Sequence, residues 1–94
     1  MKLTKKIHLN KTGKVLWADA VGYTNESLKD VMIKGFALKE TIGKICYIGK
    51  IPYKGGKVDG VIMQTEQCDG DDDGDYTILP KLWVVGFIEM EVKL

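Results

Sequence analysis

The stretch ICYIGKIPYKGGKVDGVIMQTEQ, residues 45–67, gives the strongest indication of the fold. Its two ends, 45–53 and 57–67, are rich in branched and aromatic side chains, which favour β-strands. Between them, Gly55-Gly56 tolerates the positive backbone angles that a two-residue hairpin turn requires. The stretch therefore predicts an antiparallel hairpin, and the glycines inside its strands predict a strongly curved sheet.

The predicted turn also sets the pairing of the two strands. With Gly55-Gly56 at the tip, Tyr53 faces Val58. Lys54 and Lys57 are then directly opposed, and like charges in that position destabilise a strand pair. A loop longer than two residues is therefore the alternative to the two-residue turn.

The other β-prone segments extend this hairpin into a sheet. Residues 3–9 alternate between apolar and polar side chains, as a half-exposed strand does. Residues 14–21 fit a strand or a short helix, and we favour the strand. Residues 76–79 and 81–94 are rich in Val, Ile, Phe and Trp, and Pro80 between them predicts a bulge or an edge position.

One segment has the period of an amphipathic helix. Ser27, with Asp30 three residues later, is typical of a helix N-terminus, and the helix is expected to end near Ile42. The sequence therefore predicts a single α+β domain spanning residues 1–94. It consists of a curved, mainly antiparallel sheet of about five to six strands with this one amphipathic helix packed on it. The apolar stripe of the helix contains Leu28, Val31, Met32, Gly35 and Phe36.

Charge is segregated along the chain although the net charge is only +1. Residues 1–57 hold twelve lysines and four acids, a charge of +8, whereas residues 58–94 hold two lysines and nine acids, a charge of −7. Complementary charged surfaces steer and orient association. The leading hypothesis is a non-enzymatic interaction module that self-associates into a homo-oligomer or docks on a protein partner. The absence of arginine and the spread of the lysines around the helix disfavour nucleic acid as the partner.

An acidic run, Asp69-Gly70-Asp71-Asp72-Asp73-Gly74-Asp75, is the densest cluster of charge. Its first six residues resemble the opening of an EF-hand calcium loop, in which alternate carboxylates converge on one cation and a glycine permits the turn. The resemblance implies Asp69, Asp71 and Asp73 as side-chain ligands of Ca²⁺, with the carbonyl of Asp75 as a fourth. Pro80 stands where an EF-hand has its bidentate glutamate, and the flanks have strand character. The alternatives are therefore a calcium-binding module and a solvated acidic hairpin loop without a cofactor.

Catalytic candidates are few. His8 is the only histidine, and it is expected to be an exposed strand residue. Cys46 and Cys68 lie 22 residues apart and form no CxxC motif, so neither a zinc cluster nor a redox pair is indicated. An enzyme is the third hypothesis, with an active site built at an interface between two copies.

The sequence also predicts where the protein is found. Residues 1–6 begin with charge and do not lead into the apolar stretch of a signal peptide. No window approaches the length of apolar sequence needed to cross a bilayer. We therefore expect a soluble cytoplasmic protein without a membrane partner.

Overall fold

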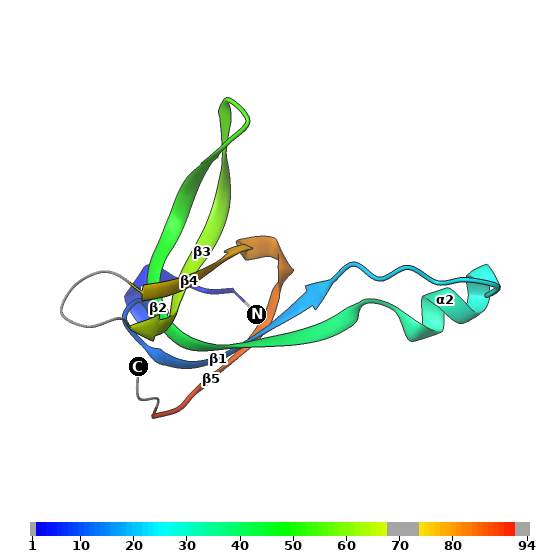
Figure 1. Cartoon of the computed structure of the whole chain (residues 1–94), viewed down its shortest axis with the longest axis horizontal. Coiled ribbons are helices and arrows are strands. Elements are labelled where there is room, and N and C mark those ends of the chain that lie inside the picture. Colours follow the sequence, from blue (N-terminus) through cyan, green and yellow to red (C-terminus); the bar gives the residue numbers. More distant parts are fainter. Residues whose placement is uncertain (1, 68–73, 92–94) are drawn as a thin grey trace.

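Five antiparallel strands form an open sheet in the computed structural model, which describes residues 2–67 and 74–91 (Figure 1). The strand order is β4-β3-β2-β1-β5, so each strand pairs with its sequence neighbour except β5, which returns to the free edge of β1. This arrangement confirms an antiparallel sheet of five strands in a mixed α and β chain. The elements in chain order are α1 (Lys5–His8), β1 (Thr12–Asp19), α2 (Leu28–Lys34), β2 (Ala37–Tyr53), β3 (Gly56–Gln67), β4 (Gly74–Pro80), the 3-10 helix η1 (Lys81–Trp83) and β5 (Val84–Glu89).

The long strand β2 joins two differently directed parts of the sheet. Its first half pairs with β1 from Ala37 to Lys44, and its second half pairs with β3 from Lys44 to Tyr53. The register shifts between Ile45 and Tyr47, so Cys46 forms a bulge, and bulges bend a strand. In Figure 1 the β2–β3 hairpin therefore points away from the β1–β2 ribbon.

The β2–β3 hairpin has a two-residue turn, but the predicted turn residues are wrong by one position. The turn is Lys54-Gly55, with φ angles of 46° and 78°. Tyr53 consequently pairs with Gly56 and not with Val58. This register differs from the predicted one by two residues, which preserves the face on which each side chain lies. It also removes the predicted opposition of two lysines, since Lys57 pairs with Pro52.

The core is formed by residues of all five strands together with Leu3 of the N-terminal segment. Leu79 comes from the end of β4, just before Pro80, and the chain then turns through η1 into β5. Pro80 thus ends an edge strand, as predicted. Trp17 and Phe87 are partly buried and pack against the core. The buried apolar residues are Leu3, Val15, Ile45, Ile48, Val61, Met63, Leu79 and Val84.

The N-terminal segment differs from the predicted strand over residues 3–9. Residues 5–8 form the single helical turn α1, closed by a hydrogen bond from the His8 amide to the Thr4 carbonyl at 2.9 Å. In return, the Thr4 amide donates to Nδ1 of His8 at 3.0 Å. His8 is therefore buried, with its ring edge-on to Phe87, and the prediction of an exposed strand residue is wrong.

The predicted amphipathic helix is shorter than expected and does not cover the sheet. Ser27 caps it as predicted, but α2 ends at Lys34 because Gly35 adopts a φ of 67°. Residues 37–42, predicted as helix, belong to β2. No residue of α2 is buried, and the predicted packing of one amphipathic helix on the sheet is not confirmed.

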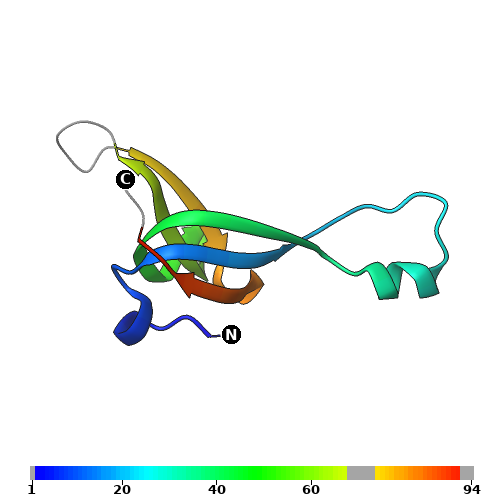
Figure 2. The same ribbon diagram turned by 90° about the horizontal axis from the view of Figure 1, so that it is seen from below.

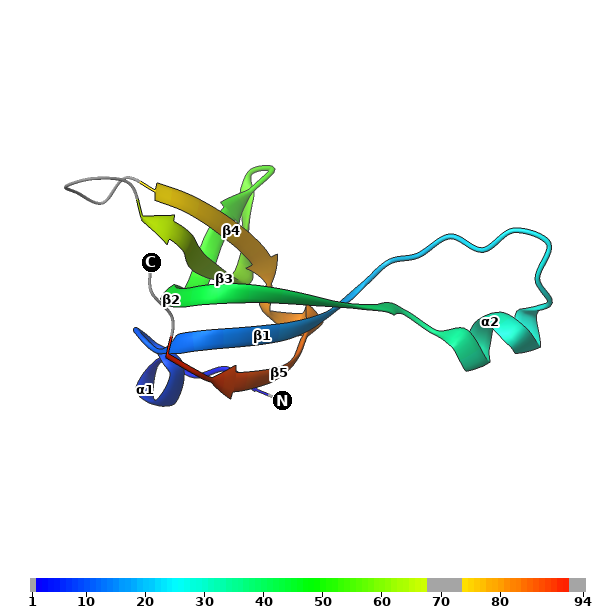
Figure 3. The ribbon, with the colours of Figure 1, turned by 60° about the horizontal axis from the view of Figure 1, so that its bottom comes forward.

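Instead, α2 lies at the end of a projection from the β1–β2 ribbon (Figures 2 and 3). The radius of gyration is 15.4 Å. A compact domain of this length has a value of about 12 Å. The chain therefore has an extended shape with one strongly projecting part.

Candidate functional site

The projection is formed by residues 20–36, between β1 and β2, and is called the arm below. Its apolar side chains are unusually exposed: Leu28, Met32, Ile33 and Phe36 each expose 75–77% of their surface. Single exposed apolar residues are common on proteins, but a cluster of them marks an interaction site. This exposure of apolar side chains on the arm favours a surface that contacts another molecule.

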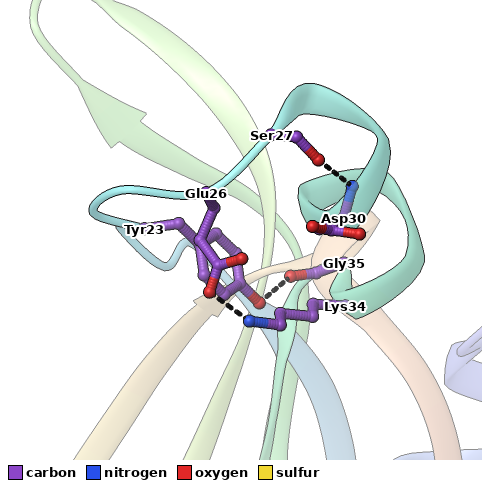
Figure 4. A network of polar contacts seen from close by, with 6 residues as sticks. All are labelled: Tyr23, Glu26, Ser27, Asp30, Lys34 and Gly35. Carbon is purple, nitrogen blue, oxygen red and sulfur yellow. Dashed lines mark hydrogen bonds and ion pairs between the residues drawn. The ribbon is translucent and has the colours of Figure 1, made fainter.

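The arm has its own network of polar contacts, which fixes its shape (Figure 4). The Tyr23 hydroxyl donates to the Gly35 carbonyl at 2.8 Å, linking the two sides of the arm. Lys34 forms an ion pair with Glu26, and its ammonium lies 5.6 Å from the centre of the Tyr23 ring. Ser27 Oγ accepts from the Asp30 amide at 3.1 Å and caps α2. These contacts connect the two sides of the arm and hold the start of α2 in place.

Two charged side chains of the arm lack a partner within the described part of the chain. Lys29 and Asp30 are exposed, and neither takes part in an ion pair there. Since helical residues are spaced by 100°, Lys29 projects between Met32 and Ile33. The exposed face of the arm is therefore apolar with a lysine among its apolar side chains and a carboxylate beside them.

A second candidate surface is an apolar groove of about 360 Å³ between the β2–β3 hairpin, the end of β4 and η1. Among the described residues lining it, Asp59 is the only charged one. Tyr53 and Trp83 are 59% and 44% exposed there. The groove is lined mainly by Ile51, Tyr53, Val58, Asp59, Ile78 and Trp83.

Trp83 is held in place by a stack of two tryptophans. Its ring lies parallel to that of Trp17, with 6.2 Å between centroids, and Trp17 Nε1 donates to Thr41 Oγ1 at 3.0 Å. A second hollow of about 650 Å³ shares Val58, Asp59, Pro80 and Trp83 with the groove, and it is also lined by Lys81 and the exposed Leu82. The groove is thus an apolar surface with the Asp59 carboxylate in its lining and Lys81 in the lining of the adjoining hollow.

The fold brings part of the basic and acidic halves of the sequence together. Pairing of β1 with β5 allows an ion pair from Lys11 to Glu89 at 3.7 Å. Pairing of β2 with β3 allows one from Lys50 to Asp59 at 3.2 Å. These exposed pairs contribute little to stability, but they partly neutralise the charge that is segregated in the sequence. Apolar exposure on the arm is therefore the stronger indication of an interaction surface.

Most of the predicted calcium ligands cannot be placed. Asp69, Asp71 and Asp73 lie outside the described residues, and Asp75 is an exposed residue of β4. The carbonyl of Asp75, predicted as a ligand, accepts a hydrogen bond from Thr65 Oγ1 at 3.2 Å. β3 and β4 pair as far as Gln67 and Gly74. The acidic run therefore connects two strands of a hairpin, as the strand character of its flanking residues predicts. The calcium site itself stays a prediction.

Sequence reasoning identified the helix stripe but assigned it to the wrong surroundings. The groove was missed, because Tyr53 and Trp83 are 30 residues apart and meet only through the pairing of β2, β3 and β4. Exposure of a tryptophan beside Pro80 gives no signal in the sequence.

Other kinds of site find no support in residues 2–67 and 74–91. There, no three His, Cys, Asp or Glu side chains gather where a metal ion could be held. No helix of this part of the chain is long and apolar enough to span a membrane. Comparisons with protein-family models, curated proteins and solved structures found no match.

Proposed function

We propose that the protein is a non-enzymatic interaction module that self-associates, with the arm as its contact element. The observation that carries this proposal is the exposure of Leu28, Met32, Ile33 and Phe36 on an arm whose shape is already fixed by internal contacts. Burying one such side chain fully is worth about 1.5–3 kcal/mol. Four of them supply a driving force for association that the isolated chain leaves unused.

Charge gives this association its orientation. The arm carries an unpaired lysine and an unpaired carboxylate, and the β-sheet carries four of its six acids on β3, β4 and β5, with Asp19 on β1 and Glu40 on β2. Charged groups at the rim of an interface affect the association rate and the fit of partners more than the affinity. The apolar arm therefore supplies the affinity, and the charge layout predicted from the sequence supplies the specificity.

Replacing Met32 and Phe36 together by serine should prevent self-association without unfolding the protein. Both side chains are about three quarters exposed, so their loss hardly affects the core. We expect the dissociation constant measured by sedimentation equilibrium to rise at least about 30-fold, the size of a hot-spot loss. Ile7→Ser, which changes a side chain that is 61% exposed on α1, is the matched control and should associate like the wild type.

Two outcomes would contradict the proposal. A wild-type protein that stays monomeric at millimolar concentration does not self-associate, and docking on a different protein would then be the remaining form of the interaction hypothesis. A Met32→Ser/Phe36→Ser variant with the same mass distribution as the wild type would show that the arm is not the contact element.

A second candidate function is calcium binding by the acidic run. The pairing of Gln67 with Gly74 supports it, because it holds the two ends of the run together across the β3–β4 hairpin. Five aspartates among seven residues repel one another, and a divalent cation would relieve this repulsion.

Calcium should accordingly raise the melting temperature if this second function is correct. A ligand present at a hundred times its dissociation constant stabilises the folded state by about 2.7 kcal/mol. The increase is measured by thermal denaturation in calcium and in chelator, and it should disappear in the Asp71→Asn/Asp73→Asn variant. Identical melting curves in calcium and chelator would exclude the site.

A further inference from the structure

We infer that the receptor for the arm is the groove beside Trp83 on a second copy, and that two copies exchange arms reciprocally to form a closed dimer. This inference rests on the proposed self-association and adds the surface on which the arm docks. The groove is lined by residues of β2, β3, β4 and η1, and the arm lies between β1 and β2.

The two surfaces match in polarity. The arm offers Leu28, Met32, Ile33 and Phe36, and the groove offers aliphatic and aromatic side chains with Asp59 as its one charged lining residue in the described part of the chain. A volume of about 360 Å³ lies at the lower end of the range for binding pockets, which suits a few inserted side chains better than a large ligand. Aromatic residues in a desolvated pocket are typical interface anchors.

The charges beside the two surfaces are complementary. Lys29 lies among the apolar side chains of the arm, and Asp59 lines the groove. Asp59 already contacts Lys50 through one carboxylate oxygen, and an ionised carboxylate has further acceptor sites. Asp30 is next to Lys29, and Lys81 lines, together with Asp59 and Trp83, the hollow that adjoins the groove. Neither Asp30 nor Lys81 takes part in an ion pair within residues 2–67 and 74–91. One lysine and one carboxylate on the arm can thus face one carboxylate and one lysine on the groove.

The contact has to be made between copies. All three views place α2 at the far end of the arm, away from the β2–β3 hairpin and from η1. The contacts of Tyr23, Glu26 and Lys34 join residues of the arm to one another and none of them to the sheet.

Reciprocal exchange also limits the assembly to two copies. When an arm enters a groove on another molecule, the two surfaces in contact are different. Repeated contacts of this kind build an open chain unless the copies are related by a closed symmetry. A two-fold axis between the copies closes it, because each contributes one arm and one groove. Each arm–groove contact then needs to bury only about 800 Å² for the dimer to reach the ~1,600 Å² of a standard stable interface.

The first experiment compares variants of the two surfaces by sedimentation equilibrium. Tyr53→Ser/Val58→Ser changes the groove at two side chains that are 59% and 43% exposed, and it should raise the dissociation constant at least about 30-fold, like the arm variant. Ile7→Ser is again the control, and the melting temperature of each monomer checks that the fold is intact. If the groove variant dimerises like the wild type while the arm variant does not, the groove is not the receptor, but the proposed function stands.

The second experiment locates the contact directly in the otherwise unchanged protein. A photoreactive benzoylphenylalanine is placed at Phe36, and copies with light and heavy nitrogen are mixed before irradiation. We expect cross-links between a light and a heavy copy that join position 36 to residues 51–60 or 78–83. Cross-links between two arms, or to residues outside these ranges, would overturn the inference. A wild type that is monomeric throughout would remove both the inference and the proposed self-association.

Discussion

Replacing Ile45 by alanine is expected to lower the free energy of unfolding by about 2–5 kcal/mol. The side chain is fully buried, and it lies beside the bulge at Cys46 where β2 changes partner from β1 to β3. Its backbone also holds the turn before β1, through hydrogen bonds from the Asn10 amide at 2.8 Å and to the Lys11 carbonyl at 2.9 Å. The cavity would therefore open where the two parts of the sheet meet, and little rearrangement is available to fill it.

The loss at Ile45 is measured by urea denaturation, with Ile42→Ala as the control. Ile42 lies three residues earlier on the same strand and is 44% exposed, so its replacement should cost at most about 1 kcal/mol. For a domain of this size a loss of 3 kcal/mol lowers the melting temperature by more than about 10 °C. Equal costs at the two positions would show that the core is not centred at the bulge.

Gly43→Ala should be strongly destabilising although it adds only one methyl group. A Cβ atom at this position would lie 2.2 Å from the backbone oxygen of Gln64 and 3.2 Å from the Cα of Thr65. Both neighbours are backbone atoms of β3, so relief requires a strand to move, and overpacking of this kind costs about 1–3 kcal/mol or more. We expect a loss of about 3 kcal/mol in chemical denaturation.

Gly22→Ala is the matched control for this clash. Gly22 is an exposed arm residue, and a Cβ there would meet no atom within 4 Å. Its replacement should leave stability unchanged or raise it by a few tenths of a kcal/mol, because alanine restricts the unfolded chain. If Gly43→Ala were as well tolerated as Gly22→Ala, β2 and β3 would not approach each other as closely as the structure shows.

Comparing the sheet variants with the arm variants separates effects on stability from effects on association. Ile45 and Gly43 lie in the sheet, whereas Met32 and Phe36 lie on the arm. The first pair should lower the melting temperature of the monomer, and the second should change only the concentration at which copies associate. A variant that changes both would indicate that the arm is stabilised mainly by its partner.

Local sequence patterns predicted the strands well where branched and aromatic residues strongly favour a strand over other secondary structure. Branched and aromatic residues, which fit a half-buried sheet, predicted the hairpin over 45–67 and the strand over 14–21. In the hairpin, the glycine-containing turn also indicated that its two strands are connected. The turn was misplaced by one residue because Lys54 adopts a positive φ, which sequence reasoning reserves for glycine.

The predictions of a long helix on the sheet and of a strand over residues 3–9 were wrong for a different reason. The stripe from Leu28 to Phe36 has the correct period for burial against a sheet, but periodicity does not identify what covers it. The alternation of residues 3–9 similarly suited a strand, yet the reciprocal hydrogen bonds between Thr4 and His8 close a helical turn. Such contacts depend on where the chain is held by the rest of the core.

Residues that are near neighbours along the chain suffice to predict most of the strands, the helix cap at Ser27 and the charge of the acidic run. In contrast, the projection of α2 on an arm, the stacking of Trp83 on Trp17 and the groove lined by Asp59 become visible only in the folded chain. These features follow from the bend of β2 at Cys46 and from the return of β5 to β1. Both bring together residues that are far apart in the sequence, and no local preference specifies such contacts.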